Sequence, residues 1–386
     1  MAGDTLSLEL GPIRPPSESE SLLLRVTRNC PWNHCSFCKT YKKHKFSKRS
    51  VAEVKADIDA VAEIVLRLEE LSRKLGYGGE VSGMVAAHVE TKGLDGVDSQ
   101  SAMHVAHWLY FGKGSVFLQD ANSLVLPADK LCEILNHLKM RLPQISRITS
   151  YARSQTLAKK SVEDLKKLRT AGLDRIHVGL ESGSEHVLEI QCKGTTPEEH
   201  IKGGKNVIEA GMELSEYIMP GAGGREFSKE NALETARVLN EIDPHFIRVR
   251  TFTPLPRSEI YQMIEAGEFA PNSDDESVEE LRLMIEKLDV KRSYLASDHI
   301  MNLLQELEGQ IPQDKERMLK TIDDYLALDA DTRLRFRLAR RLGMATSVEN
   351  LNHPMLQDRV EEILSRLKNM PGDIEENIRK IASRHL

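Results

Sequence analysis

Short apolar runs alternate with longer amphipathic stretches from about residue 22 to residue 264. The short runs are rich in β-branched and aromatic residues, which favour β-strands. Six of them predict strands, at Leu22–Thr27, Ser115–Gln119, Arg147–Ala152, Arg175–Leu180, Glu213–Met219 and Phe246–Phe252. The stretches between them repeat apolar residues with the period of a helix, and several have a proline near the start or a glycine at the end. The pattern therefore predicts an α/β domain with parallel strands and right-handed crossovers.

Two architectures fit six strands that alternate with helices. Six strands are too few to close an eight-stranded barrel, which leaves an open, partial (β/α)6 barrel or a doubly wound sheet. Residues 21–270 are predicted to form this domain, with residues 1–20 as an N-terminal lead-in. Residues 77–100 form a glycine-rich insertion, a composition typical of a mobile flap or of a plain connector. Residues 271–386 are almost wholly helical in pattern and predict a helical C-terminal domain.

The composition and net charge limit the kinds of protein that this chain could be, but they do not identify a binding partner. The 386 residues carry a formal net charge of −6, spread along the chain, so electrostatics single out neither nucleic acid nor membrane. No apolar run reaches the ~18 residues of a membrane span, and the first residues lack the layout of a signal peptide. We therefore expect a cytoplasmic protein without a membrane span. The basic run Lys39–Arg49 is typical of a solvated loop, but it also suits an anionic ligand or an acidic redox partner.

Three of the five cysteines lie in one short segment, RNCPWNHCSFCKTY, directly after the first predicted strand. An odd number of cysteines with three bunched together argues against a disulfide framework and for metal or redox chemistry. Cys30, Cys35 and Cys38 have the spacing C-x4-C-x2-C. Zinc would need a fourth ligand, such as His34 or His44, but structural zinc usually draws on two paired clips and the sequence has one.

Two iron–sulfur interpretations of this spacing remain. The plant-type [2Fe–2S] pattern opens in the same way, and Cys132 is the next cysteine that could complete it. However, Cys132 lies inside the amphipathic stretch DKLCEILNHL, where we expect a small buried hydrophobic residue. A [4Fe–4S] cluster held by three cysteines would leave one iron open to another ligand, much as catalytic zinc keeps an open position. The spacing alone leaves these alternatives open.

The cysteine segment as a whole resembles the radical S-adenosylmethionine (radical SAM) superfamily, in a branch with a C-x4-C-x2-C loop. The resemblance rests on three cysteines after the first strand and on the aromatic Phe37 before the last of them. The commonest spacing in that superfamily is C-x3-C-x2-C, so this chain departs by one residue. The resemblance covers about residues 21 to 264 and implies the partial (β/α)6 barrel. It also implies that Cys30, Cys35 and Cys38 hold a [4Fe–4S] cluster that binds S-adenosylmethionine (SAM), with Phe37 beside the adenine.

Motifs at the ends of the next two strands match the superfamily in order. FLQDANSL follows the second strand and would offer Asp120 and Asn122 to the amino group of the bound methionine moiety. Asn122 is also placed to cap a helix, and the two roles are compatible. SYARS ends the third strand with Arg153, whose guanidinium is suited to clamp the methionine carboxylate. The resemblance thus implies SAM contacts at both strand ends.

The fourth and fifth strands carry the closer matches. GLESG ends the fourth strand, where the resemblance places Glu181 and Ser182 against the ribose or methionine of SAM, and Gly183 would allow a close backbone approach. YIMPGAGGRE resembles the glycine-bearing end of the fifth strand, where Gly221 would line the adenosine. Sites in parallel α/β folds lie at the carboxyl ends of the strands, which is where all of these motifs fall.

The resemblance implies a specific chemistry. A reduced cluster donates an electron to SAM and the C5′–S bond breaks, which yields a 5′-deoxyadenosyl radical that takes a hydrogen atom from a substrate. The cofactors carry this chemistry, and the protein must position the substrate and exclude water and oxygen. The alternative function is a non-catalytic iron–sulfur or zinc protein whose helical C-terminal domain binds a partner. Polar groups at several strand ends favour the enzyme, because a purely structural metal would not require them.

Candidate catalytic residues on the substrate side begin with Tyr217 and Arg250. Arg248 and Arg250 are two residues apart and share one face of the sixth strand. If that face lines the barrel, two guanidinium groups would favour an anionic substrate. The alternative is that the face lies outside or that the guanidinium groups pair with acidic neighbours.

Two further candidates are His299 and Cys192. His299 lies with Asp298 and Asn302 at a predicted helix start, where Asp298 is suited to be the N-cap. Cys192, beside Lys193 in a short loop, would be placed to donate a hydrogen atom to a product radical, although a bystander thiol is the plainer interpretation.

The expected partners follow from this interpretation. We expect a small-molecule substrate and a flavodoxin- or ferredoxin-type electron donor, and we do not expect nucleic acid as a partner. The sequence has no second cysteine set for an auxiliary cluster, and bound cobalamin is not expected either. The sequence does not indicate the substrate or the outcome after hydrogen abstraction.

Overall fold

The computed structural model describes residues 5–369 and 372–382, and the chain divides into two compact units. The first unit comprises Met1–Pro31, Lys43–His177 and Asn206–Glu213. The second unit comprises Trp32–Lys42, Val178–Lys205 and Leu214–Leu386. Both units draw on segments that are far apart in the sequence. No described helix combines the length and the apolar character that crossing a membrane requires.

The first unit is built on parallel strands in the order β1-β4-β5-β6. These strands are β1 (Leu22–Arg25), β4 (Ser115–Gln119), β5 (Arg147–Ala152) and β6 (Leu173–Glu181). The parallel pairing of β1 with β4 and of β4 with β5 places their carboxyl ends side by side. A separate antiparallel ribbon joins β2 (Thr27–Arg28) to β3 (Ser47–Lys48) and brackets the cysteine segment. The boundary between the two units falls within β6.

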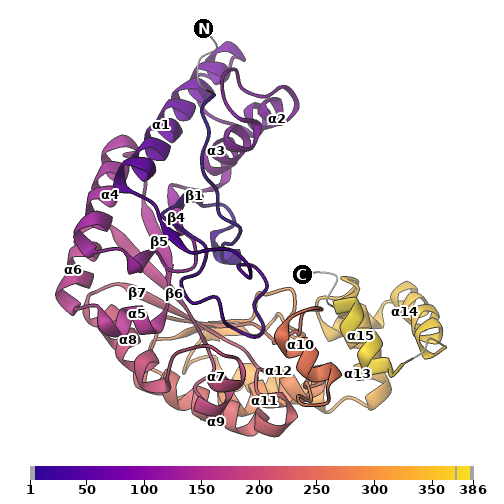
Figure 1. The fold of residues 1–386 in the computed structure, drawn as a ribbon. Coiled ribbons are helices and arrows are strands. Elements are labelled where there is room, and N and C mark those ends of the chain that lie inside the picture. Colours follow the sequence, from indigo (N-terminus) through magenta and orange to yellow (C-terminus); the bar gives the residue numbers. More distant parts are fainter. Residues whose placement is uncertain (1–4, 370–371, 383–386) are drawn as a thin grey trace. The chain divides into compact units, whose positions relative to one another are not determined.

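Helices cover the outer side of this sheet. In Figure 1, α1, α4 and α6 lie side by side along β1, β4 and β5. Helix α1 begins at a capping box, in which Ser50 and Glu53 each accept from the other's backbone amide. The helical elements that lie wholly in the first unit are η1 (Pro16–Glu18), α1 (Val51–Lys74), α2 (Gly83–Lys92), α3 (Ser99–Phe111), η2 (Ser123–Val125), α4 (Ala128–Arg141), α5 (Ser154–Lys159) and α6 (Val162–Ala171).

The second unit continues with strands in the order β6-β7-β8-β9-β10. These are β7 (Glu213–Ile218), β8 (Phe246–Val249), β9 (Tyr294–Ala296) and β10 (Glu308–Gln310). The pairs β7–β8 and β8–β9 are parallel, and β9–β10 is antiparallel. The sheet is therefore parallel except at its last pair.

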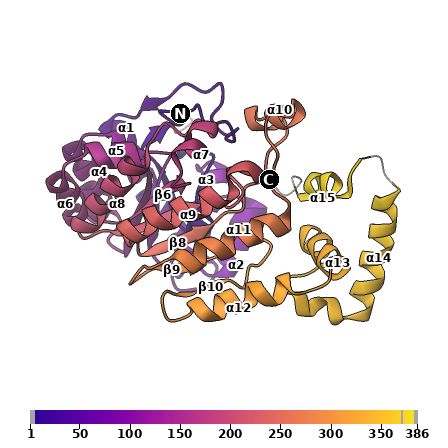
Figure 2. The ribbon, with the colours of Figure 1, turned by 90° about the horizontal axis from the view of Figure 1, so that it is seen from below.

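In this unit α9, α11 and α12 run side by side, and α13, α14 and α15 form a separate helical group near the C-terminus (Figure 2). The helical elements after β6 are α7 (Glu185–Ile190), α8 (Pro197–Glu209), α9 (Gly224–Ile242), α10 (Glu259–Glu265), α11 (Asp274–Lys287), α12 (Lys315–Leu326), α13 (Ala330–Arg341), η3 (Val348–Asn352), α14 (Pro354–Lys368) and α15 (Ile374–Ala382). Helix α8 spans the boundary between the units.

All six predicted strands are present, and the mostly parallel sheet flanked by helices confirms the predicted α/β class with a helical C-terminal region. Residues 271–386, predicted to be almost wholly helical, also contain the short strands β9 and β10, which the sequence did not predict. Each of these strands has three residues, which is too short for an alternating pattern to show. The insertion 77–100 contains α2 and so is more than a flap or a connector. The boundary at residue 270 stays a prediction.

Candidate cofactor site

The cysteine loop, residues 29–46, joins β2 to β3 without regular secondary structure. Cys30, Cys35 and Cys38 are each partly exposed and none is in a disulfide. The amide of Cys38 donates to the carbonyl of Cys35 at 3.2 Å, so these two cysteines lie one turn apart. Within the described residues, no three His, Cys, Asp or Glu side chains already converge as a ligand set. Accessible, unbridged thiols are nevertheless the donors that an iron–sulfur cluster uses, so the donor set fits.

The middle of the cysteine loop is bound to the connection between α7 and α8, within the second unit. Ser36 donates from its amide to the Gln191 carbonyl at 3.0 Å and from its hydroxyl to Gln191 Oε1 at 3.1 Å. The indole of Trp32 donates to the Cys192 carbonyl at 2.7 Å. Gly194 makes room for that ring, because a Cβ there would lie 2.0 Å from it. Several hydrogen bonds and one close contact thus hold the loop on both sides of Cys35.

Phe37, the predicted neighbour of the adenine, packs into an apolar cluster of the second unit. It packs against the buried cluster of Val187, Met219 and Ala222, as Phe227 and Phe252 also do. Gln191 ties the same region together, since its amide donates to the Ala222 carbonyl at 2.5 Å while its oxygen accepts from Ser36. The adenine contact itself stays a prediction.

In the first unit, Asp120 follows β4 and is fully buried. Its Oδ2 accepts from Arg25 Nη2 at 2.7 Å, from Arg25 Nε at 3.0 Å and from the amide of Asn29 at 2.8 Å. Burial raises the pKa of Asp120, while the Asn29 amide and the Arg25 guanidinium oppose the rise. Since Asn29 directly precedes Cys30, Asp120 fixes the start of the cysteine loop. A Cβ on Gly11 would lie 1.9 Å from Asp120 Oδ1, so the lead-in passes close over this carboxyl.

Asn122 and Arg153 come together in the same unit. The Asn122 side-chain amide donates to Thr156 Oγ1 at 2.8 Å, and its oxygen accepts from the Arg153 amide at 3.4 Å. Asn122 precedes η2, but its side chain makes no capping hydrogen bond there, so the helix-cap interpretation is wrong. Its side chain instead joins the end of β4 to the start of α5. The contacts of Asn122 and Arg153 with SAM stay predictions.

At the end of β6, Glu181 forms an ion pair with Lys193. Lys193 Nζ lies 2.9 Å from Glu181 Oε1. A Cβ on Gly179 would lie 2.2 Å from Glu181 Oε1 and 2.9 Å from Lys193 Nζ, so the absence of a side chain at Gly179 makes room for the pair. The sequence predicted Glu181 but gave Lys193 no role of its own.

Ser182, the next residue, is buried and its hydroxyl is engaged inside the protein. It donates to Asn231 Oδ1 at 2.5 Å and accepts from the Ser184 amide at 3.0 Å. These bonds join the end of β6 to α9. Direct contact between Ser182 and a cofactor stays a prediction.

The predicted cofactor residue Gly221 leads to an acid that sequence reasoning missed. The Gly221 amide donates to Glu280 Oε1 at 2.9 Å, and Asn231 donates to the same oxygen at 2.6 Å. Glu280 Oε2 accepts from the Ser228 hydroxyl at 2.6 Å and from the Asn272 amide at 3.0 Å. Burial raises the pKa of Glu280 to about 7 against these donors. Glu280, on α11, therefore holds the glycine-bearing segment after β7.

Hydrogen bonding between β6 and β7 fixes which residues share a face. The Met219 amide donates to the Glu181 carbonyl at 2.8 Å, which in a parallel pair puts Glu181 opposite Ile218. Two residues earlier, Gly179 is then opposite Glu216. We call the face that carries Gly179, Glu181 and Glu216 the Glu181 face. Tyr217, which follows Glu216, points to the other side of the strand.

The predicted catalytic residues Tyr217 and Arg250 meet on the side away from the Glu181 face. The Arg250 guanidinium lies 4.9 Å from the centre of the Tyr217 ring. Arg248, opposite Tyr217 in β8, pairs with Asp298 at 2.9 Å. The alternative of an acidic neighbour thus holds for Arg248, whereas Arg250 stacks on Tyr217. An anionic substrate stays a prediction. Catalytic roles for Tyr217 and Arg250 stay predictions.

His299 and Cys192 complete the predicted set. No helix begins at Asp298, so the N-cap interpretation is wrong. Asn302 instead accepts from the Thr251 amide at 2.8 Å. Burial lowers the pKa of His299 to about 4, and Arg250 adds to the effect, so this imidazole is neutral near pH 7. Cys192 is exposed, and its carbonyl is the acceptor for Trp32.

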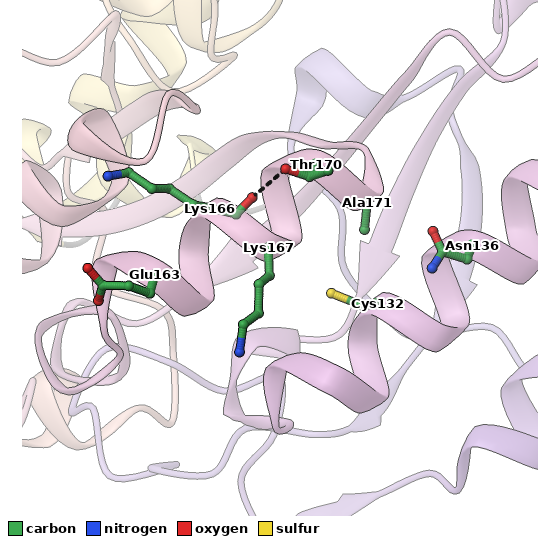
Figure 3. A pocket seen from close by; sticks show the side chains of 7 residues that line it. All are labelled: Cys132, Asn136, Glu163, Lys166, Lys167, Thr170 and Ala171. Carbon is green, nitrogen blue, oxygen red and sulfur yellow. Dashed lines mark hydrogen bonds between the residues drawn. The ribbon is translucent and has the colours of Figure 1, made fainter.

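Cys132 lies in a separate place and was misjudged as a buried core residue. It is partly exposed and lines a shallow cavity of about 500 Å³ in the first unit. Figure 3 shows that the lining comes from α4, with Cys132 and Asn136, and from α6, with Glu163, Lys166, Lys167, Thr170 and Ala171. Burial raises the pKa of the Cys132 thiol. None of the three loop cysteines lines this cavity, so it offers no support for a [2Fe–2S] site completed by Cys132.

Comparison with known families identifies the part of the chain that follows the cysteine loop. A sequence model described as the radical SAM superfamily matches residues 100–239, a segment that contains Asp120, Arg153, Glu181 and Gly221. Residues 100–239, about a third of the chain, are thus similar to the radical SAM superfamily. Members of that superfamily use a [4Fe–4S] cluster and SAM. The match begins after the cysteine loop, so the assignment of Cys30, Cys35 and Cys38 rests on their spacing and chemistry.

Curated relatives match only part of this chain. The protein of Methanocaldococcus infernus called tRNA uridine(34) acetyltransferase is 23% identical over 120 residues, which are 31% of this chain and 22% of that relative. The protein of the same name from Methanocaldococcus jannaschii is 23% identical over 118 residues, or 30% of this chain and 22% of the relative. The matched segment thus spans about a fifth of each relative's length.

Three solved structures show partial similarity to this chain. The archaeal Methanocaldococcus infernus Elp3 has 14% identity and a TM-score of 0.40, over 72% of this chain and 56% of that one. The cobalamin-dependent enzyme OxsB has 14% identity and a TM-score of 0.46, over 94% and 52%. Coproporphyrinogen III oxidase (HemN) from Escherichia coli has 13% identity and a TM-score of 0.43, over 69% and 51%.

Sequence reasoning missed several residues that hold this site together. The group consists of Trp32, Ser36, Gln191, Lys193, Glu216 and Glu280. One signal was available for Glu216, because an acid inside an otherwise apolar predicted strand is unusual. The others act through contacts between segments far apart in the chain, for which one sequence holds no signal.

Proposed function

We propose that this enzyme cleaves SAM reductively at a [4Fe–4S] cluster held by Cys30, Cys35 and Cys38. The bound cofactors would supply a 5′-deoxyadenosyl radical, which takes a hydrogen atom from a small-molecule substrate. The observation that carries the proposal is the cysteine loop, bound through Ser36 and Trp32 to the segment that follows the Glu181 strand. A loop that only stabilised the fold would not need to be fixed beside the residues of a cofactor motif.

The protein's own residues would then orient the cofactors. Asp120 fixes the first end of the cysteine loop through the Asn29 amide. Lys193, a cation in the connection after α7, and its partner Glu181 at the end of β6 present a positive and a negative group to a zwitterionic ligand such as SAM. Glu280 holds the backbone at Gly221 for the adenosine.

The electron donor is proposed to be a flavodoxin or ferredoxin, because the cluster must be reduced before each cleavage. The exposed lysines of the run Lys39–Arg49 are placed beside the cysteines and would suit an acidic surface of this kind. The relatives named for tRNA share only about a third of this chain, so tRNA enters here as a comparison substrate rather than as the proposed one.

The test is anaerobic reconstitution followed by metal counting, paramagnetic resonance of the reduced protein and an assay for 5′-deoxyadenosine. We expect about four irons per chain, a signal that SAM perturbs, and slow release of 5′-deoxyadenosine. Replacing Cys30, Cys35 or Cys38 by alanine should abolish all three results, whereas Cys132→Ala should leave them unchanged. One zinc per chain, or a cluster indifferent to SAM, would contradict the proposal. Separate assays with small-molecule pools and with tRNA distinguish the substrate classes.

A further inference from the structure

Glu216 is an acid whose burial and isolation the proposed function does not explain. It lies in the middle of β7 and is 1% exposed. Neither of its carboxyl oxygens has a hydrogen-bond partner among the described residues. Burying an acid in this way costs free energy unless a partner is supplied. A buried carboxyl left without partners inside a strand therefore points to a ligand.

The register of β7 against β6 places this carboxyl in the proposed cofactor site. Glu216 is opposite Gly179 on the Glu181 face, and Gly179 leaves the space over which Glu181 and Lys193 meet. Lys193 and Glu181 are also the charged groups that act on the pKa of Glu216. Three charged side chains from β6, β7 and the connection after α7 thus gather on one face of the second unit.

The charges of this group do not balance when Glu216 is ionised. Lys193 is already paired with Glu181 at 2.9 Å, so a Glu216 carboxylate would add one uncompensated negative charge. Burial raises the pKa of Glu216 well above its usual value, Lys193 opposes the rise and Glu181 adds to it. Without a ligand, burial therefore favours the neutral, protonated acid. A cation that donates hydrogen bonds would both satisfy the two oxygens and offset the charge.

We propose that Glu216 is a ligand-contacting acid that binds a primary ammonium group of the second substrate, the molecule that gives up the hydrogen atom. This inference rests on the proposed function, since it assumes a second substrate beside SAM. On binding, the carboxylic acid releases its proton to solvent and the carboxylate accepts from the ammonium. The only bond that breaks is the O–H bond of the Glu216 carboxylic acid. The Glu181 face would thus select amines, in contrast to the anionic substrate suggested by the arginines of β8.

The experiment uses the full chain, with and without reconstituted cluster, and methylammonium as the probe. Infrared difference spectra of wild type and Glu216→Gln at pH 7 identify the band of the protonated Glu216 acid. We expect saturating methylammonium to remove that band in wild type, with release of about one proton per chain. Apparent affinity for methylammonium should fall by about tenfold or more in Glu216→Gln, because the charge-assisted hydrogen bond is lost.

Three controls make each outcome decisive. Tetramethylammonium has the charge but no N–H donor, so it should leave the band in place. Glu280→Gln removes the other acid whose pKa is near neutral, which prevents misassignment of the band. SAM alone carries an ammonium group as well. If SAM alone removes the band, the group bound is that of SAM, and the assignment to a second substrate is wrong.

The proposal is overturned if methylammonium leaves the wild-type band unchanged or binds Glu216→Gln equally well. Failure of the proposed function looks different. A chain that takes up no iron, or cleaves no SAM, contradicts the radical SAM mechanism whatever the infrared result. Conversely, if the protein has normal iron content and cleaves SAM but its Glu216 band does not respond to methylammonium, only the inference about Glu216 is contradicted.

Discussion

Two buried acids, one in or directly after a strand of each unit, have different surroundings. Asp120 in the first unit has donors on one oxygen, Oδ2, which accepts from the Arg25 guanidinium and the Asn29 amide, while its Oδ1 has no hydrogen-bond partner among the described residues. Glu216 in the second unit has no hydrogen-bond partner among the described residues. The two residues are equally buried, since Asp120 is 0% and Glu216 is 1% exposed. The first acid is committed to holding the cysteine loop, whereas the second is left available to a ligand.

The difference shows that burial alone does not tell a structural acid from a binding one. Each was as visible in the sequence as the other, since both lie in or directly after an apolar strand. The two acids differ in their hydrogen-bond partners, and these partners come from distant parts of the chain. Arg25 and Asn29 are about ninety residues before Asp120. A substitution that removes only the charge should therefore have opposite consequences at the two positions.

The largest effect is expected from the matched pair Asp120→Asn and Glu216→Gln. Asp120→Asn leaves the largely buried Arg25 without its nearer carboxylate and should lower the free energy of unfolding by about 3 to 4 kcal/mol. Glu216→Gln removes no hydrogen bond among the described residues and keeps the size of the side chain, so it should change the free energy of unfolding by less than about 1 kcal/mol. Urea denaturation at pH 7 measures both.

A double variant checks the cause of the Asp120 effect. If the loss comes from an unpaired Arg25, then adding Arg25→Met to Asp120→Asn should recover part of the stability. Equal losses at Asp120 and Glu216 would show that the two acids do not differ in the way described.

Much of the fold was predictable from the sequence, whereas the site was predictable only in part. The strand at Ser115–Gln119 was placed correctly because its apolar run is bounded by Gly114 and a polar segment. The motif residues Asp120 and Glu181 were found because they follow strands. Their partners Arg25 and Lys193 were not, because an ion pair between distant segments leaves no local pattern.

The helix start expected at Asp298 failed for a related reason. An acid before a polar turn is typical of an N-cap, but here Asp298 is held by Arg248 from the neighbouring strand. Tertiary pairing overrode the local preference. The predicted alternation of faces in β8, by contrast, is a local property, and it correctly placed Arg248 and Arg250 on one side.

Glu280 is a third buried acid. It is buried as Glu216 is, but it accepts hydrogen bonds as Asp120 does. Burial raises its pKa to about 7 even so. The folded state therefore holds a proton that the unfolded state releases near pH 4.5, and Glu280's contribution to stability falls as pH rises from 4.5 to 7. We expect a loss of about 3 kcal/mol over this window.

Unfolding measured by urea at several pH values tests this, with Glu280→Gln as the variant. The slope between pH 4.5 and 7 should flatten in Glu280→Gln, because the amide cannot ionise. Glu279→Gln is the matched control, since Glu279 is the exposed neighbour on the same helix and its substitution should leave the slope intact. A slope unchanged in Glu280→Gln would mean that the acid is already ionised below this window.

Gly194→Ala tests how the second unit holds the cysteine loop. Its φ of +63° already disfavours a side chain, and the new Cβ would lie 2.0 Å from the Trp32 ring. Gly267→Ala is the matched control, because Gly267 has a φ of +75° with nothing within 4 Å. Gly267→Ala should cost about 1 kcal/mol, and Gly194→Ala about 2 kcal/mol more.

Iron content after reconstitution adds a functional measurement to this pair. If Trp32 is what positions the loop, Gly194→Ala should bind less iron than Gly267→Ala at equal folded fraction. Equal stability losses for the two alanine variants would indicate that the indole moves aside freely and that the close contact does not hold the loop.

The smallest effect is expected for the exposed ion pair between Lys42, in the basic run, and Glu259. Their charged atoms lie 3.0 Å apart. Their side chains are 27% and 56% exposed, so water and salt screen the attraction. Glu259 also lies in the first turn of α10, where an acid is favourable without any partner. A double-mutant cycle with Lys42→Ala and Glu259→Ala removes that helix contribution and should leave a coupling below about 0.5 kcal/mol.

Repeating the double-mutant cycle at high salt should bring the coupling energy between Lys42 and Glu259 near zero. A coupling above about 1 kcal/mol that survives salt would show that this run, unlike the solvated loop expected of it, helps to fix the cysteines as Asp120 does.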